Sequence, residues 1–160
     1  MNKPNLHICP VKQLYSLAGR LENNEAVAAI LCTTGMISKA KLEGITHIHV
    51  SFADVTDSHR YDAFKPEKAQ RIKRFVDNLE GIDTLYICCD SGESRSTAVA
   101  AAILRYWGDD ETTIWRNVHY HPNRLVYYLQ CKAFNCSVTK IRALVLSQYN
   151  KSLFRKQIRS

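Results

Sequence analysis

The sequence predicts an α/β fold in which a mostly parallel central sheet is flanked by helices on both faces. Short apolar runs of strand length, such as Ala26–Cys32 and Leu85–Cys89, recur along the chain. Segments with helical periodicity lie between them, for example from Pro66 onward. Because strands that alternate with helices usually form parallel sheets covered on both sides, we expect one domain of this class over residues 1–160.

Three strand candidates lie in the first half of the chain. Leu6–Cys9 is a short apolar segment, and Pro10 opens an amphipathic stretch behind it. Ala26–Cys32 is apolar throughout, which is typical of a strand buried on both faces. Thr46–Phe52 alternates and is rich in β-branched residues, so it also indicates a strand.

Helices dominate the remainder of the chain. From Pro66 the apolar residues follow a helical period as far as Leu79, and proline suits the first helical position. Leu85–Cys89 is the last strand candidate, and a short polar segment follows it. The helical segments after that are Thr97–Trp107, Asp110–Val118, Asn123–Phe134 and a last helix from about Ser137.

The composition is that of an ordinary globular domain. Hydrophobic residues make up 46% of the chain and charged residues 23%. Lysine and arginine number 22 against 15 acidic residues, a net charge of +7 that favours anionic partners such as phosphoesters, nucleic acid or acidic membrane surfaces. A solvated basic surface without a partner would give the same charge.

The cysteines indicate a reducing environment. Residues Met1–Cys9 are too polar for a signal peptide, and no apolar run approaches the roughly 18 residues that a membrane span needs. Six cysteines in such a chain are expected to be free thiols, which favours a cytoplasmic location. None has the CxxC spacing of a zinc site, and the pairs His47/His49 and His119/His121 lack acidic or cysteine partners at ligand spacing. We therefore expect no metal and no other cofactor.

The segment that carries chemistry is Cys-Asp-Ser-Gly-Glu-Ser-Arg-Ser at residues 89–96, between a predicted strand and a predicted helix. Five residues between a cysteine and an arginine can curl so that their backbone N–H groups point inward. The N-terminus of the following helix adds positive charge, which makes an anion site. In that field Cys89 is stabilised as a thiolate and becomes a nucleophile near neutral pH.

We predict a phosphate-binding loop in which Cys89 is the nucleophile and Arg95 holds two phosphoryl oxygens with its planar guanidinium. The Ser96 hydroxyl can donate to the sulfur and ease its departure. Gly92 supplies the φ freedom that the curl requires. The residues expected to bind the phosphate group are Asp90, Ser91, Gly92, Glu93 and Ser94.

A Cys-x5-Arg-Ser segment between a strand and a helix resembles the signature of the protein tyrosine phosphatase superfamily. Its position past mid-chain is most similar to the small dual-specificity branch, and the resemblance covers about Ala26–Phe134. It implies a metal-independent phosphatase that forms a cysteinyl-phosphate, in a single phosphatase-like domain over residues 1–160. It also implies that variable side chains of the loop face outward, which we expect for Asp90 and Glu93.

The resemblance further implies an aspartate, on a loop after an upstream strand, as the general acid. Asp54 directly follows the predicted strand Thr46–Phe52, and Phe-Ala-Asp is similar to the aromatic-x-Asp pattern of several relatives. Asp54 is therefore the preferred candidate. Asp57, 32 residues before Cys89, fits the usual sequence separation better and stays open. Asp62 is the third carboxylate of the same loop.

One residue departs from the family pattern. The position before the nucleophile is usually histidine, which orders the loop and favours the thiolate, and here it is Cys88. A second thiol there could resolve an oxidised nucleophile. On a strand, however, neighbouring side chains point to opposite faces, and a vicinal disulfide is strained. A small core residue is the simpler interpretation of Cys88.

Two functions remain open from the sequence. The first is hydrolysis of a phosphomonoester, by a protein tyrosine or dual-specificity phosphatase. The alternative is a catalytically weak phosphate-recognition module, supported by the missing histidine. In both cases the expected partner is a phosphorylated protein or another phosphomonoester, with no stable nucleic-acid complex and no membrane span. Phosphotyrosine, phosphoserine or phosphothreonine, a phosphoinositide and an RNA phosphate all fit such a loop, since pocket depth decides among them.

Overall fold

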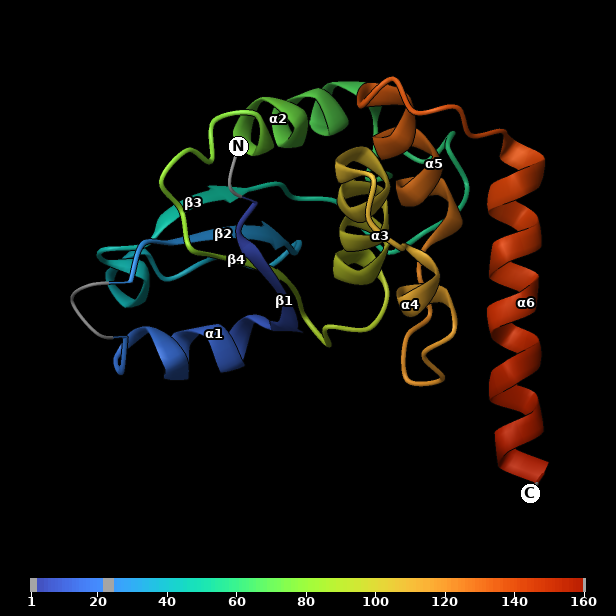
Figure 1. Ribbon diagram of the computed structural model, residues 1–160, viewed down its shortest axis with the longest axis horizontal. Coiled ribbons are helices and arrows are strands. Elements are labelled where there is room, and N and C mark those ends of the chain that lie inside the picture. Colours follow the sequence, from blue (N-terminus) through green and yellow to red (C-terminus); the bar gives the residue numbers. More distant parts are fainter. Residues whose placement is uncertain (1–2, 22–24, 160) are drawn as a thin grey trace.

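A parallel four-stranded sheet, in the order β1-β4-β2-β3, organises the computed structural model, which describes residues 3–21 and 25–159. Every neighbouring pair of these strands is parallel. The strands are β1 (Asn5–Pro10), β2 (Val27–Cys32), β3 (Thr46–His49) and β4 (Thr84–Cys89). The predicted α/β class with a parallel central sheet is confirmed (Figure 1).

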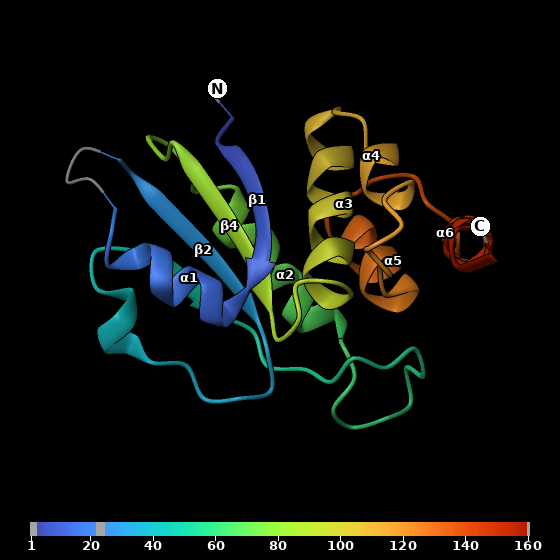
Figure 2. The same cartoon turned by 90° about the horizontal axis from the view of Figure 1, so that it is seen from below.

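Helices cover both faces of this sheet, as predicted (Figures 1 and 2). On one face lie α1 (Val11–Ala18) and the 3₁₀ helix η1 (Lys39–Leu42). On the other lie α2 (Pro66–Val76), α3 (Arg95–Trp107) and α5 (Arg124–Ala133). The outer helices are α4 (Thr112–Trp115), which packs on α3, and α6 (Lys140–Arg159), which packs on α4 and α5. None of the helices in the described ranges is long and apolar enough to cross a membrane.

The two faces of β4 belong to two separate hydrophobic cores. Leu85, Ile87 and Cys89 point into the larger core, under α2, α3 and α5. Cys88 points into the smaller core, under α1 and η1. This alternation is the period-two pattern of a strand, and it sends the two adjacent cysteines in opposite directions.

Strand β3 ends earlier than predicted. The strand predicted for Thr46–Phe52 ends at His49, and the Val50 amide still bonds the Leu31 carbonyl at 2.9 Å. The chain then leaves the sheet, because Phe52 is buried against Phe64 and its carbonyl accepts a hydrogen bond from the side chain of Arg95. The prediction of strand through Phe52 was wrong for this reason.

Helix boundaries also differ from the predictions. The helix predicted to reach Leu79 ends at Val76, and Leu79 is buried from the turn that follows. The predicted helix Asp110–Val118 is a single turn, Thr112–Trp115. Local sequence pattern locates such elements but not their ends, since the last turn depends on tertiary packing.

Candidate active site

Residues 89–96 curl at the C-terminal end of β4, against the end of β1. At the turn, Gly92 has φ 73°, a conformation that residues with a Cβ rarely adopt. A Cβ added there would lie 2.9 Å from both the Cys9 carbonyl carbon and the Pro10 nitrogen. Glycine is therefore required twice, once by its φ and once by the close approach to β1. The predicted φ freedom at Gly92 is confirmed.

Cys89 lies at the start of this curl, and the residue is 1% exposed. The Gly92 N–H donates to Sγ at 3.2 Å, and the Ser96 Oγ lies 3.1 Å from it. Burial raises the pKa of the Cys89 thiol, but the Ser96 hydroxyl and the backbone amides of Ser96, Ser94 and Gly92 lower that pKa further, so the net shift is downward. The thiolate therefore forms at a lower pH here than in an ordinary cysteine.

The N-terminus of α3 opens onto the same curl. Ser94 occupies its N-cap position without a side-chain capping bond, and the first turn contains no acidic residue. The first N–H groups of a helix lack intrahelical acceptors, so an anion is stabilised at this point. The Thr97 hydroxyl holds the end of the loop through contacts with the carbonyls of Glu93 at 2.7 Å and Ser94 at 2.8 Å.

Arg95 lies across the site and is only 7% exposed. Its Nη1 donates to the Phe52 carbonyl at 3.1 Å, and its Nη2 donates to the Asp90 carboxylate. Its Nε is buried and has no acceptor within the described residues. A buried donor without an acceptor is costly, and a phosphoryl oxygen would satisfy it. The guanidinium is thus fixed by the protein on one edge and has a donor left for a ligand.

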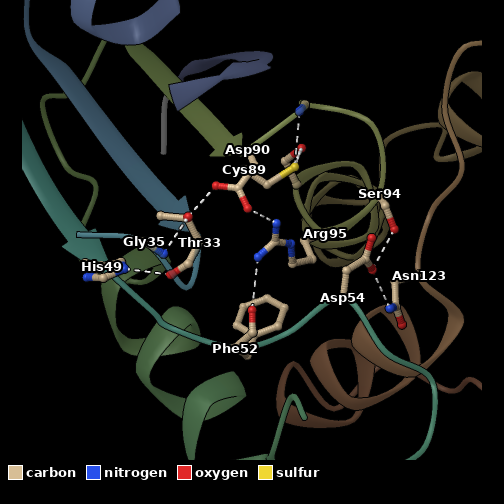
Figure 3. Close-up of polar contacts among 12 residues, drawn as sticks. Thr33, Gly35, His49, Phe52, Asp54, Cys89, Asp90, Ser94, Arg95 and Asn123 are labelled. Atoms are coloured by element: carbon tan, nitrogen blue, oxygen red, sulfur yellow. Dashed lines mark hydrogen bonds and ion pairs between the residues drawn. The ribbon is translucent and has the colours of Figure 1, made fainter. Parts of the chain in front are cut away.

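Asp90 is exposed, as expected, with 58% of its side chain accessible, but it also has partners in the site. Its carboxylate is hydrogen-bonded to both the Thr33 hydroxyl and Arg95 (Figure 3). Burial raises the pKa of Asp90, while these two donors and the positive charge of Arg95 lower it, and the net shift is downward. The contacts with Thr33, just beyond β2, and with Arg95 were not predicted. Glu93 is exposed, in line with the prediction.

The three candidate acids occupy different positions. Asp54 accepts from the Ser94 hydroxyl at 2.8 Å and so contacts the loop itself (Figure 3). Asp57 accepts from the backbone amide of His59 at 2.9 Å, within its own turn. Asp62 is in an ion pair with Arg60 at 2.7 Å. Only Asp54, of these three, is hydrogen-bonded to residues 89–96.

Asn123 is a site residue that sequence reasoning missed. Its buried side chain caps α5 by accepting from the Leu125 and Val126 amides at 3.0 and 3.2 Å. The amide group of the same side chain donates to Asp54 at 2.8 Å and to the Val55 carbonyl at 3.1 Å. An asparagine before a helix is a recognisable capping signal, but nothing in the sequence indicates its second partner. Thr33 was missed for the same reason.

Cys88 lies on the far side of the sheet from the nucleophile. Its Sγ is 3.5 Å from the Sγ of Cys9, its partner on β1, and both residues are buried. Burial and the hydrogen bond with Cys9 raise the pKa of Cys88. Its thiol faces the smaller core, as the core-residue interpretation predicts, and points away from Cys89.

The remaining candidate ligands have structural partners. His47 Nδ1 is 2.8 Å from the Ile45 carbonyl, and His49 Nε2 is 2.8 Å from the Thr33 carbonyl. In residues 3–21 and 25–159 no group of three His, Cys, Asp or Glu side chains could hold a metal ion. All six cysteines are free thiols, as expected.

Comparisons with known proteins reveal the fold but no sequence relative. No protein-family model matches the chain, and no curated protein matches it. Among solved structures, DUSP15 aligns with a TM-score of 0.57 at 15% identity, over 96% of this chain and 92% of that chain. PTPMT1 aligns with a TM-score of 0.53 at 14% identity, over 98% and 96%. PTPMT1 in complex with PI(5)P aligns with a TM-score of 0.51 at 14% identity, over 96% and 94%.

These neighbours are structures of the protein tyrosine phosphatase superfamily. The chain therefore has the fold of the superfamily whose signature its Cys-x5-Arg-Ser segment resembles. The likeness extends well beyond the predicted range Ala26–Phe134, to nearly the whole chain. The roles of the individual site residues rest on the geometry described above.

Proposed function

We propose that this chain is a cysteine-dependent phosphatase that hydrolyses phosphomonoesters without a metal ion, of the protein tyrosine or dual-specificity type. One observation carries the proposal. Cys89, whose thiol has a lowered pKa, contacts the Gly92 amide and the Ser96 hydroxyl at the N-terminus of α3, and the buried Nε of Arg95 has no acceptor among residues 3–21 and 25–159. A nucleophile and an anion site in the same curl suit phosphoryl transfer.

In the first step the Cys89 thiolate attacks the phosphorus, and the bond from phosphorus to the ester oxygen breaks. Arg95 and the loop amides, including that of Gly92, hold the phosphoryl oxygens and balance their charge. Asp54 gives its proton to the departing oxygen. Its contacts with Ser94 and Asn123 hold the carboxyl group at the loop.

In the second step water attacks the cysteinyl-phosphate, and the bond from sulfur to phosphorus breaks. The Asp54 carboxylate takes a proton from that water, which returns the acid to its starting state. The Ser96 hydroxyl, 3.1 Å from the Cys89 sulfur, stabilises the departing thiolate. Inorganic phosphate and the free enzyme result, and the loop supplies the positive charge that a metal supplies elsewhere.

The substrate class is broader than phosphoprotein alone. A phosphorylated protein fits the dual-specificity resemblance. A phosphoinositide is a second candidate, because one structural neighbour was solved in complex with PI(5)P. A reducing, cytoplasmic location stays a prediction, supported by the six free thiols.

Turnover of p-nitrophenyl phosphate in the presence of a chelator tests the proposal. We expect phosphate release that the chelator does not reduce, since no metal takes part. Binding of inorganic phosphate without turnover would contradict the proposal and would support a phosphate-recognition module instead.

A further inference from the structure

A second cavity adjoins the loop on the side away from the sheet. It is a groove of about 620 Å³, and it shares Asp54 and Ser94 with the candidate active site. Its other walls come from the segment after Asp54, from Pro122–Arg124 and from one side of α6, including Ser147 and Lys151. Figure 1 shows α6 standing along α4 and α5, at the edge of the molecule. The groove therefore continues the site toward the C-terminal helix.

The charges in this groove are unevenly engaged. Arg60 is paired with Asp62, Asp54 accepts from Ser94 and Asn123, and Asp57 accepts from the His59 amide. Arg124 and Lys151, by contrast, form no ion pair or hydrogen bond with any carboxylate in residues 3–21 and 25–159. Two cations in a concave surface beside a phosphate loop favour a second anion.

The charge distribution along the chain also places positive charge in the C-terminal segment that lines the groove. All 15 acidic residues lie within residues 1–111, together with 13 of the 22 lysines and arginines. Residues 112–160 contain the other nine and no acidic residue. The net charge of +7 is thus concentrated in the segment that supplies Arg124 and α6. The wall that residues 112–160 supply is therefore positive, while the carboxylates Asp54 and Asp57 line the opposite wall.

We propose that the groove binds a second phosphate group of the substrate through Arg124 and Lys151, while the first phosphate lies in the loop between Cys89 and Arg95. This inference rests on the proposed function and narrows its substrate class to small molecules or headgroups with two phosphate groups. The groove has the volume of a small-molecule site, which is roughly 300–1,000 Å³. Such a headgroup can be free in solution or attached to a lipid.

Competitive inhibition of p-nitrophenyl phosphate turnover by two inorganic anions tests the groove. This test does not depend on which molecule carries the two phosphate groups of the substrate. Inorganic phosphate fills the loop alone, whereas tripolyphosphate reaches beyond it. We expect tripolyphosphate to have the lower inhibition constant in the wild-type chain. The ratio of interest is the inhibition constant of phosphate divided by that of tripolyphosphate. In the Arg124→Ala/Lys151→Ala double variant this ratio should fall about tenfold, since two charge-assisted contacts are lost.

Two further variants separate this effect from folding and from net charge. Arg124→Lys keeps the charge at the groove and should retain most of the ratio. Lys132→Ala removes one charge from the exposed last turn of α5, outside the groove, and should leave the ratio unchanged. An equal loss in Lys132→Ala, or an unchanged ratio in the double variant, would overturn the proposal.

The source of the second phosphate is tested with one headgroup in two forms. Phosphate release is compared between inositol 1,4-bisphosphate in solution and phosphatidylinositol 4-phosphate in phosphatidylcholine vesicles. A release that depends on Arg124 and Lys151 supports the proposal and identifies the free or the lipid-borne form. Release from both that is unaffected by the double variant contradicts it.

Failure of the groove can be told from failure of the proposed function. If the wild-type chain does not turn over p-nitrophenyl phosphate, the proposed function is wrong. The affinities of the same two anions are then measured by calorimetry. A tighter binding of tripolyphosphate that the double variant loses would still support the second anion site.

Discussion

Cys88 and Cys89 are adjacent in the chain, yet the two faces of β4 give them opposite chemistry. Cys89 faces the larger core at the N-terminus of α3, where the Ser96 hydroxyl and the loop amides surround its sulfur. Cys88 faces the smaller core, where its Sγ lies 3.5 Å from the Sγ of Cys9. Both are almost fully buried, so exposure does not distinguish them.

The direction of the pKa shift does distinguish them. Burial raises the pKa of both thiols, but only at Cys89 do hydrogen bonds to the sulfur outweigh it. The comparison teaches that donors aimed at the sulfur, and not access to solvent, lower the pKa of Cys89. Each prediction below alters one face and leaves the other intact.

The largest effect is expected for Cys89→Ser. Serine keeps the shape of the loop but is a poor nucleophile at neutral pH, so turnover should fall by about 10⁴-fold or more. Binding of inorganic phosphate, measured by calorimetry, should be largely retained because Arg95 and the amides remain. Hydrolysis at a rate comparable with wild type would show that Cys89 is not the nucleophile.

Asp54→Asn should reduce turnover by about 10²–10⁴-fold, the usual contribution of a general acid. The loss should be larger for phenyl phosphate than for p-nitrophenyl phosphate, because the poorer leaving group needs the proton more. The basic limb of the pH–rate profile should also disappear. Asp62→Asn is the matched control, since Asp62 is paired with Arg60. If Asp57→Asn gives this pattern in place of Asp54→Asn, the acid has been misassigned.

Arg95→Lys should lower kcat/KM by about 10²–10³-fold, nearly as much as Arg95→Ala. A lysine cannot bond the Phe52 carbonyl and the Asp90 carboxylate while also presenting a donor at the position of Nε. Steady-state kinetics with p-nitrophenyl phosphate measures the loss. Retention of more than about half of kcat/KM, a change below ~0.4 kcal/mol, would contradict the clamp role.

Alkylation compares the two thiols directly. The pKa of Cys89 lies below its ordinary value, so its thiolate fraction near neutral pH exceeds that of an ordinary cysteine, whereas the raised pKa of Cys88 keeps that thiol protonated. Iodoacetamide near neutral pH should therefore modify Cys89 first, as peptide mass spectrometry would show. The acid limb of kcat/KM should rise at a lower pH than a free thiol would give. Earlier modification of Cys88 would reverse the comparison.

The smallest effect on activity is expected on the other face. Cys88→Ala removes a buried sulfur and its contact with Cys9, which should destabilise the fold by about 1 kcal/mol. That corresponds to roughly 2–4 °C in Tm for a domain of this size. The kcat/KM should stay within about twofold of wild type, since nothing on the catalytic face changes. A loss near that of Cys89→Ser would mean that the two faces are coupled.

Much of this site could be predicted from the sequence. The strand Leu85–Cys89, the glycine of the loop and the helix after it lie within one short segment, so local pattern was sufficient to place Cys89, Gly92 and Arg95 together. The preference for Asp54 over Asp57 also came from a local feature, its position directly after a strand, and Asp54 is the one bonded to the loop. Its role as the acid stays a prediction.

The other contacts join residues far apart in the chain. Thr33 reaches Asp90, Phe52 reaches Arg95, and Asn123 reaches Asp54. Asp90 is exposed, as expected, but its bonds to Thr33 and Arg95 were missed because the loop was considered in isolation. A loop side chain turns toward whichever partners the fold brings near, and those partners leave no periodic trace in the sequence.

By itself, the sequence determined the α/β class, the curl of residues 89–96 and the opposite directions of Cys88 and Cys89, because strand alternation and glycine φ freedom act over a few residues. Only the tertiary structure decided which donors surround the sulfur, which carboxylate meets Arg95 and which side of α6 completes the groove beside the loop. The physical reason is that hydrogen bonds and ion pairs depend on distances of a few ångströms. Between segments far apart in the chain, those distances exist only after the sheet and helices have packed.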